Sequence, residues 1–180
     1  MLAYVFWHRP RPHVAPAHYE AGLAAFHQAL AAHPPDGFRE SLRARVEGAP
    51  WLDGPGYEDW YLVDDWAALG RLNDAAVQGA RRTPHDAVAA ETGAGVAGVY
   101  RRMLGAPQPD GAHATWFHKP DGMPHAEVGE ALDGHLRGRD ASLWQRQLTL
   151  GPTPEFCLLA DAPVDLGAWR TITVARDALA

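Results

Sequence analysis

Three segments of the chain occur twice, in the same order, and this repetition constrains the architecture more than any other feature. Phe6-Trp7-His8-Arg9-Pro10 resembles Trp116-Phe117-His118-Lys119-Pro120, and a Ser-Leu-x-x-Arg motif begins at Ser41 and again at Ser142. The segment 59–65 similarly resembles 155–161. The separation of the copies falls from 110 residues (6 to 116) to 101 (41 to 142) and then 96 (59 to 155). Such a pattern predicts an internal duplication with shorter loops in its second half.

The hydrophobic spacing of each half predicts the same order of elements. Alternating or continuously apolar runs predict strands, and apolar residues three and four apart predict helices. The expected strands are 2–8, 38–47 and 58–64 in the first half, and 113–118, 141–150, 155–161 and 169–174 in the second. The expected helices are 18–32, 66–78 and a piece starting at Thr83, then 124–136, while 93–104 fits either a helix or a strand.

Each half therefore begins strand, helix, strand, strand. A crossover through a helix makes two strands parallel, and the hairpin strand can lie between them, as in the ferredoxin-like pattern. Such a sheet has one bare face, and two halves can bury these faces against each other. We expect an α+β fold with a first repeat and added helices over 1–105, a linker over 106–111 and a second repeat over 112–180.

With these repeated segments, the chain resembles the ferredoxin-like dimeric α+β-barrel superfamily, as an internally duplicated, fused member that forms a pseudo-dimer. The resemblance covers most of the chain in element order and identifies no specific family. It implies a setting in which cofactor-free monooxygenases, lactone isomerases, dehydratases and haem enzymes of the chlorite-dismutase kind all occur. A shared fold does not choose among these activities.

Composition narrows the classes of partner. The net charge of −6 and the pI near 5.9 argue against nucleic-acid binding, which normally uses a basic face. No apolar run reaches the roughly 20 residues of a membrane helix. The lone Cys157 cannot form an intrachain disulfide, so nothing requires an oxidising compartment. We expect a cytoplasmic protein, a monomer or a homodimer, with a small-molecule ligand as its partner.

The candidate catalytic residues are His8 and His118, which lie at the ends of predicted strands in the two repeats. Imidazole is suited to acid–base work near neutral pH. In a strand, His8 shares a face with Tyr4 and Phe6. The structural alternative is a histidine that bonds a loop carbonyl and holds a turn. If a site exists, we expect it in one half only.

The candidate ligand-binding residues are Arg45, Arg146, Trp7 and Trp116. The two arginines end the Ser-Leu-x-x-Arg motifs, and an arginine beside a serine in a cavity would bind a carboxylate or enolate oxygen. Alternatively, the same charges solubilise an edge strand. The chain has seven tryptophans, so most will fill the core, and some could line a pocket for a flat or apolar ligand.

Two motifs are interpreted as structural. His18-x-Glu20 resembles His125-x-Glu127, which with the strand-end histidines suggests paired metal sites. That match needs a separation of 107 residues (18 to 125), whereas the apolar helix faces match at 109 (23 to 132). No metal site is therefore predicted, because the first register would bury unpartnered carboxylates. The glycines of 93–98 satisfy G-x-G-x-x-G without a preceding strand, so we expect close packing there rather than a nucleotide site.

The leading hypothesis is a small-molecule-binding protein or a cofactor-independent enzyme of the monooxygenase or isomerase type. Its base would be His8 or His118. The alternative is a non-catalytic interaction or assembly protein with no enclosed site. A third hypothesis is a haem-binding protein with one histidine as ligand; no other cofactor is predicted.

Overall fold

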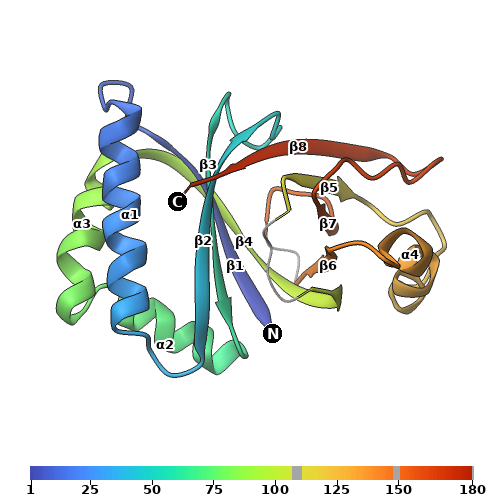
Figure 1. Cartoon of the computed structure of the whole chain (residues 1–180), viewed down its shortest axis with the longest axis horizontal. Helices are drawn as coiled ribbons and strands as arrows, with labels where there is room; N and C mark the ends of the chain where they lie inside the picture. The colour runs from blue at the N-terminus through green and yellow to red at the C-terminus, as the bar shows by residue number, and fades with distance from the viewer. Residues whose placement is uncertain (107–110, 148–150, 180) are drawn as a thin grey trace.

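The computed structural model describes residues 1–106, 111–147 and 151–179, and eight strands of this part close into one barrel. Three helices cover one side of the barrel and a fourth covers the opposite side (Figure 1). The strands are β1 (Leu2–Pro10), β2 (Phe38–Glu47), β3 (Gly56–Val63), β4 (Thr92–Gly105), β5 (His113–Phe117), β6 (Ala141–Arg146), β7 (Phe156–Ala160) and β8 (Thr171–Ala178). The α-helices are α1 (Pro16–Ala32), α2 (Trp66–Ala76), α3 (Arg82–Glu91) and α4 (Val128–Leu136). Single turns of 3₁₀ helix, Gly79–Arg81 and His125–Glu127, precede α3 and α4.

Local sequence explains where the helices begin and end. Pro16 stands in the first turn of α1, where a missing N–H costs nothing, and Pro34 and Pro35 follow its end. At the start of α2 the Asp65 side chain accepts a hydrogen bond from the backbone N–H of Ala68 at 2.8 Å. The buried residues of α1 and α4 match at a separation of 109 (19 to 128 and 23 to 132), as the packing argument predicts.

The strand order around the barrel is β1-β3-β2-β8-β5-β7-β6-β4, and all neighbouring strands pair antiparallel. In the first half β3 therefore lies between two mutually parallel strands, β1 and β2. In the second half β7 lies in the same way between β5 and β6. Both arrangements confirm the expected crossover. The ambiguous segment 93–104 is a strand, β4, which joins the halves by pairing with both β1 and β6.

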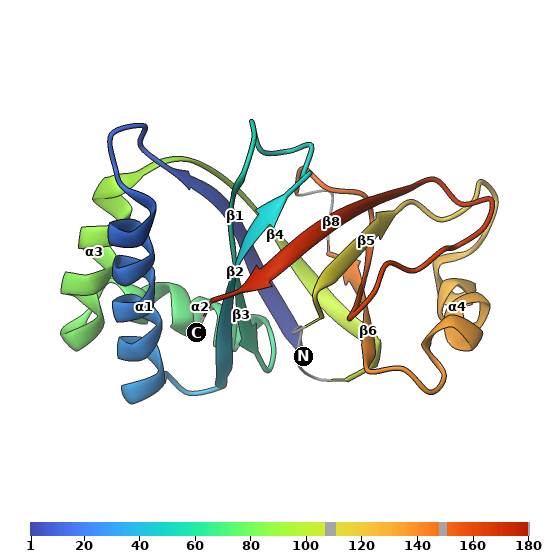
Figure 2. The same ribbon diagram turned by 45° about the horizontal axis from the view of Figure 1, so that its top comes forward.

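The last strand, β8, makes the other junction. It pairs with β5 on one side and with residues 44–47 of β2 on the other. Figure 2 shows it crossing the molecule from α4 towards α1. Residues 107–110 of the expected linker and the end of the expected strand 141–150 lie outside the described residues.

The strand registers correct the sequence matching of the two halves. Trp7 and Trp116 both point into the barrel, and they pair with Glu58 and Cys157 respectively. Residue 7 therefore corresponds to residue 116, a separation of 109 rather than 110. The structural counterpart of His8 is Phe117, and His118 follows the end of β5. A slip of one residue moves every side chain of a strand to the opposite face.

The Ser-Leu-x-x-Arg motifs show the same shift. On β6, Trp144 points into the barrel, and its indole N–H donates to the Ser142 hydroxyl at 2.8 Å. On β2, Arg43 and Arg45 lie on the outer face. In the strand register they stand opposite Asp59 and Tyr57 of β3. The repeated motif aligns Arg45 with Arg146, but the two side chains lie on opposite faces of the barrel wall, because the motifs differ in strand register by one residue.

The barrel interior is packed with tryptophan around one buried ion pair. Trp7, Trp60, Trp116 and Trp144 have no exposed surface. The Glu58 carboxylate accepts hydrogen bonds from the indoles of Trp7 at 2.8 Å and Trp60 at 2.9 Å, and it pairs with the Arg176 guanidinium. The interior is a filled core, and the space for a ligand lies outside it. No helix in the described part of the chain is both long and apolar enough to cross a membrane.

Candidate functional site

A cavity of about 840 Å³ lies between the outer face of the first-half sheet and the helices α1, α2 and α3. Its wall is mainly apolar, with Phe6, Leu23, Phe26, Leu72 and Val88 among the lining residues. Trp66, half exposed, also lines it from the start of α2. Apolar walls with a few convergent polar groups are typical of small-molecule sites.

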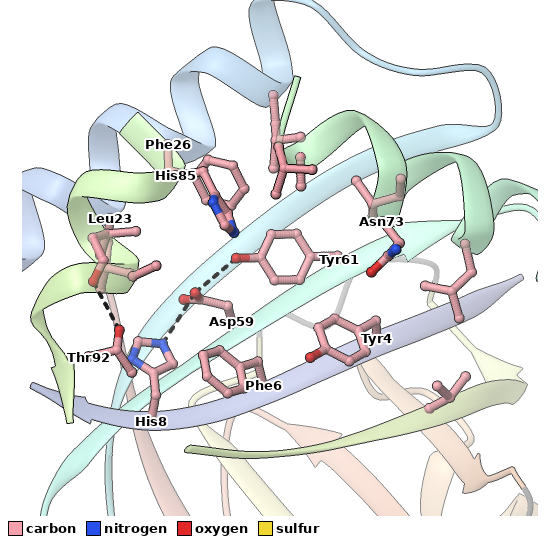
Figure 3. A pocket seen from close by; sticks show the side chains of 18 of the residues that line it. Tyr4, Phe6, His8, Leu23, Phe26, Asp59, Tyr61, Asn73, His85 and Thr92 are labelled. Atoms are coloured by element: carbon pink, nitrogen blue, oxygen red, sulfur yellow. Dashed lines mark hydrogen bonds and ion pairs between the residues drawn. The ribbon is translucent and has the colours of Figure 1, made fainter. Parts of the chain in front are cut away.

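The polar groups of the cavity centre on Asp59, a carboxylate in the middle of β3 that is only 2% exposed. Its Oδ2 lies 3.2 Å from Nε2 of His8 and accepts a hydrogen bond from the Tyr61 hydroxyl at 3.0 Å. Its Oδ1 lies 3.5 Å from Nε2 of His27, a buried residue of α1. Figure 3 shows His8 and Tyr61 on either side of Asp59. We call Asp59, His8, His27 and Tyr61 the Asp59 cluster.

His8 is held from every side. Its Nδ1 lies 2.7 Å from the Tyr19 hydroxyl, which in turn lies 2.8 Å from the hydroxyl of Thr92. The imidazole ring stacks between Phe6, at 4.8 Å between centroids, and Tyr57, at 5.8 Å. Both nitrogens and both ring faces therefore have partners, so the side chain is fixed in one orientation.

Electrostatics in the Asp59 cluster favour a charged carboxylate beside neutral phenols. Burial opposes ionisation of Asp59, but His8 and His27 outweigh it and hold the pKa of this carboxyl below its usual value. Burial raises the pKa of Tyr61 well above its usual value, and the charge of Asp59 adds to the effect. Burial also raises the pKa of Tyr19 to about 12, although its hydrogen bond to Thr92 acts in the opposite direction. Tyr19 and Tyr61 therefore remain protonated hydroxyl groups at neutral pH.

Among the described residues, the matching surface of the second half has no such cluster. The strand pairing places Phe117 at the position of His8, Phe156 at that of Tyr57 and Leu158 at that of Asp59. Phe117 and Phe156 stack at 5.4 Å, as His8 and Tyr57 stack at 5.8 Å. These residues pack with α4 in an apolar cluster. The same architecture is thus filled by apolar side chains in one half and by a polar cluster in the other.

Of the residues singled out from the sequence, His8 lines the cavity and the other five do not. His118 is 63% exposed in its side chain and lies 3.6 Å from Glu155. Arg45 is half exposed and pairs with Glu20 and Asp177. Arg146 donates hydrogen bonds to the carbonyls of Gly151 and Thr153 beside a small polar pocket. Trp7 and Trp116 lie in the barrel interior.

Sequence reasoning missed Asp59, Tyr19 and His27. Asp59 stood within a repeated segment, and its signal was a pair of acidic residues, Glu58 and Asp59, in a strand that is otherwise glycine, aromatic or apolar. Tyr19 and His27 lie on the buried side of α1, and their helical spacing does not distinguish them from core residues. Within the described residues, no group of three or more His, Cys, Asp or Glu side chains is placed to hold a metal ion.

The glycines of 93–98 allow close packing at the edge of the cavity. A Cβ atom on Gly95 would lie 2.4 Å from the ring of Phe6, which is far too close. This segment belongs to β4 and packs against β1. The expectation of small-residue packing is confirmed.

No family model matches the sequence, and no curated protein is significantly similar to it. Solved structures do resemble the fold. An anthrone oxidase-like protein aligns over 99% of this chain and 91% of its own, with 13% identity and a TM-score of 0.51. A chlorite dismutase-like protein aligns over 99% and 95%, with 11% identity and a TM-score of 0.53. At these identities the likeness concerns the fold alone. The chain therefore shares the ferredoxin-like α+β-barrel fold of these proteins, and no specific family is identified.

Proposed function

We propose that the cavity binds a small, mainly apolar, ring-containing molecule and that the protein is a cofactor-independent acid–base enzyme. The Asp59 cluster and Tyr19 are the proposed catalytic groups. The observation that carries this proposal is the polar cluster on the floor of an apolar cavity, at positions that the second half fills with apolar residues.

The cost of burying these groups supports a functional role. A buried carboxylate and its partners lose hydration, and replacing such a group by packed apolar side chains is often neutral or stabilising. Phe117 and Leu158 occupy the corresponding places in the second half, so the fold does not require the polar set. Strongly perturbed titratable groups in a cavity are typical of functional sites.

The lining residues favour a neutral ligand. The charged or titratable types among them are Asp59, the histidines His8 and His85, and the tyrosines, with no lysine or arginine along the described lining. An anionic ligand would therefore meet the negative charge of Asp59 without a compensating guanidinium or ammonium group. A neutral ring compound that carries a carbonyl or hydroxyl group fits both the apolar wall and the hydroxyl of Tyr19.

The geometry assigns a role to each group. The Asp59 carboxylate lies 3.2 Å from Nε2 of His8, on the side of the imidazole where a carboxylate orients the histidine of a catalytic triad. Nδ1 of His8 then faces the hydroxyl of Tyr19. Because Tyr19 keeps its proton at neutral pH, it passes a proton between His8 and the ligand rather than storing charge.

Anthrone, a tricyclic ketone, is a suitable probe because one structural neighbour is described as anthrone oxidase-like. Its oxidation by O₂ gives anthraquinone and water, so one O₂ is consumed per anthrone. We expect O₂ uptake and anthraquinone formation with the purified protein, and a loss of about 100-fold or more in rate in His8→Phe, as is usual for removal of an acid–base group.

The matched control is His118→Ala, in the exposed histidine that follows β5. It should retain full activity. If anthrone and related ketones neither turn over nor perturb the fluorescence of Trp66, the proposed function is refuted. Equal activity in His8→Phe and the wild type would refute the assignment of His8.

The haem alternative depends on His85. Both nitrogens of His8 are engaged, whereas Nδ1 of His85 contacts the Asp86 carboxylate at 3.0 Å, which leaves Nε2 as the candidate iron ligand in this cavity. Bound haem would supply redox chemistry. Addition of haem should then give a Soret band that is lost in His85→Ala. A protein without that band dismisses the alternative.

We further propose that the two halves arose by duplication, which the matching strand orders support. A homodimer is compatible with the dimeric members of this fold class, and light scattering would distinguish it from a monomer. If separately produced 1–105 and 112–180 segments reassemble into the barrel, two structural repeats are supported.

A further inference from the structure

One tyrosine hydroxyl in the cavity has no hydrogen-bond partner among the described residues. The chain has five tyrosines. The other four hydroxyls each contact a side chain: those of Tyr19, Tyr57, Tyr61 and Tyr100 lie beside His8, Glu20, Asp59 and Thr153 respectively. The fifth, on Tyr4, makes no hydrogen bond with any residue that the structure describes. Its proton is therefore available to a ligand.

The neighbouring strands explain why this hydroxyl is left over. Tyr4 lies on β1 between Tyr61 of β3 and Val99 of β4. The ring of Tyr61 is 6.0 Å away between centroids, and its hydroxyl donates to Asp59 at 3.0 Å. The side chain of Val99 has no polar atom. The sheet thus places a phenol on the floor of the cavity whose hydrogen-bonding capacity the described neighbours do not use.

The hydroxyl of Tyr4 is also accessible from the cavity. Tyr4 lines the cavity and is only partly buried, whereas His8 and Tyr19 have no exposed surface. Figure 3 shows the Tyr4 hydroxyl directed along the cavity floor towards Phe6 and Asp59. A ligand can therefore reach this group without displacing a hydrogen bond between described residues.

Electrostatics decide which kind of ligand oxygen fits beside Tyr4. Burial raises the pKa of Tyr4, and the charge of Asp59 adds to the effect. The hydroxyl therefore keeps its proton at neutral pH and can act as a donor. The same negative charge disfavours a ligand carboxylate. A neutral carbonyl oxygen carries no charge and only accepts, so it matches the donor.

We propose that Tyr4 recognises the ligand by donating a hydrogen bond from its hydroxyl to the carbonyl oxygen of a neutral ring ketone. The rings of the ketone fill the apolar part of the cavity, which includes Phe6, Leu72 and Val99. The inference rests on the proposed function, because it requires ring compounds to bind in this cavity. It adds a binding residue outside the Asp59 cluster and narrows the ligand class to ketones.

Selection against hydrocarbons follows from the same contact. A ring hydrocarbon would exclude water from the Tyr4 hydroxyl and offer no acceptor, and a buried polar group that is left unpaired is costly. A site that hydrogen-bonds one group of its ligand therefore rejects the analogue that lacks this group.

The test compares fluorenone with fluorene, a three-ring ketone and the hydrocarbon of nearly the same shape. Binding is measured at equilibrium by quenching of tryptophan fluorescence and needs no turnover. Fluorenone should bind Tyr4→Phe about tenfold more weakly than the wild type, because the ring is kept and only the hydroxyl is lost. Fluorene should bind Tyr4→Phe at least as well as the wild type. The control Tyr100→Phe removes a hydroxyl that faces Thr153 inside the barrel, and it should leave both affinities unchanged.

Equal affinity of fluorenone for the wild type and Tyr4→Phe would overturn the inference. So would a parallel loss for fluorene, since it would indicate altered packing instead of a lost hydrogen bond. If neither compound binds the wild type, the cavity is not a site for ring compounds, and the proposed function and this inference both fail. If fluorenone shows the expected loss but anthrone is not oxidised, only the proposed enzyme activity is refuted.

A second measurement needs no ligand. Because the Tyr4 hydroxyl has no partner among the described residues, Tyr4→Phe should unfold at the same urea concentration as the wild type. Tyr61→Phe removes a donor to the buried Asp59 carboxylate and should unfold at a lower concentration. A Tyr4→Phe protein that unfolds earlier than the wild type, or fails to fold, would overturn the inference, since the hydroxyl would then serve the fold itself.

Discussion

His8 and Asp59 can be replaced by the residues at the matching places of the second half. The single and double replacements measure how much unfolding free energy is lost when one group is left unpaired and how much when the whole pair is removed. The changes are His8→Phe, as at Phe117, and Asp59→Leu, as at Leu158. Asp59 is 2% exposed and His8 is fully buried. Each single change leaves one buried polar group without its partner, whereas the double change removes both groups. The unfolding free energies of the single and double variants should therefore differ sharply.

His8→Phe alone leaves a buried carboxylate supported by Tyr61 at 3.0 Å and by His27 at 3.5 Å. Breaking a buried pair in this way costs about 3–5 kcal/mol of unfolding free energy. Asp59→Leu alone leaves Nε2 of His8 without its carboxylate partner and the Tyr61 hydroxyl without its acceptor, and it costs about 1–3 kcal/mol, the usual penalty for an unsatisfied buried polar group. The double variant should lie within about 1 kcal/mol of the wild type or above it.

The assay is urea denaturation at pH 7, followed by circular dichroism and tryptophan fluorescence. The expected coupling free energy between the two sites is about 3 kcal/mol or more, since the double variant should be far more stable than the sum of the singles predicts. If the losses of unfolding free energy in the two single variants simply add in the double variant, apolar side chains cannot replace the His8–Asp59 pair, and the reasoning is refuted. Matched changes at the exposed pair His118 and Glu155 should cost below about 1 kcal/mol.

Three further predictions concern titration and packing. The folded-state pKa of Asp59 is lowered, so its stabilising charge is present above the ordinary pKa of about 3.9 and is lost as the pH falls below that value; wild-type stability should drop more between pH 5 and pH 3 than that of His8→Phe/Asp59→Leu, and equal drops would contradict the assignment. All five tyrosines have raised pKa values, mainly through burial, so tyrosinate absorbance at 295 nm should stay low in the native protein at pH 10 and appear on unfolding; a full native signal at that pH would disprove this. Gly95→Ala should cost about 1–3 kcal/mol because its Cβ would overlap Phe6, whereas Gly134→Ala, in open space on α4, should stabilise by up to about 1 kcal/mol; similar effects at both sites would contradict the packing argument.

Most of the scaffold could be predicted from the sequence because it depends on periodicity. The spacing of Tyr19 and Leu23 gave the buried face of α1, and the alternation in 38–47 gave β2. The placing of β3 between β1 and β2 followed from the crossover. The exact match of the halves did not follow, because aromatic similarity aligned His8 with His118, whereas pairing with β3 and β7 aligns it with Phe117.

The candidate site could be predicted only in part. His8 was identified from its place at a strand end, on one face with Tyr4 and Phe6, and all three line the cavity. Its partner Asp59 is 51 residues away in the sequence (8 to 59), on the neighbouring strand. Only the sheet register brings the two side chains together, and periodicity within either strand carries no information about that register.

The closure of the barrel by β8 has a consequence for synthesis of the chain. The last strand made is the one that pairs with residues 44–47 of β2, near the middle of the first half. Until the second half leaves the ribosome, β1 to β4 present two free edges, at β2 and at β4, and an uncovered face that includes Trp7 and Trp60. The nascent first half is therefore prone to aggregation until the second half has emerged. Slow decoding between the halves should favour aggregation over folding.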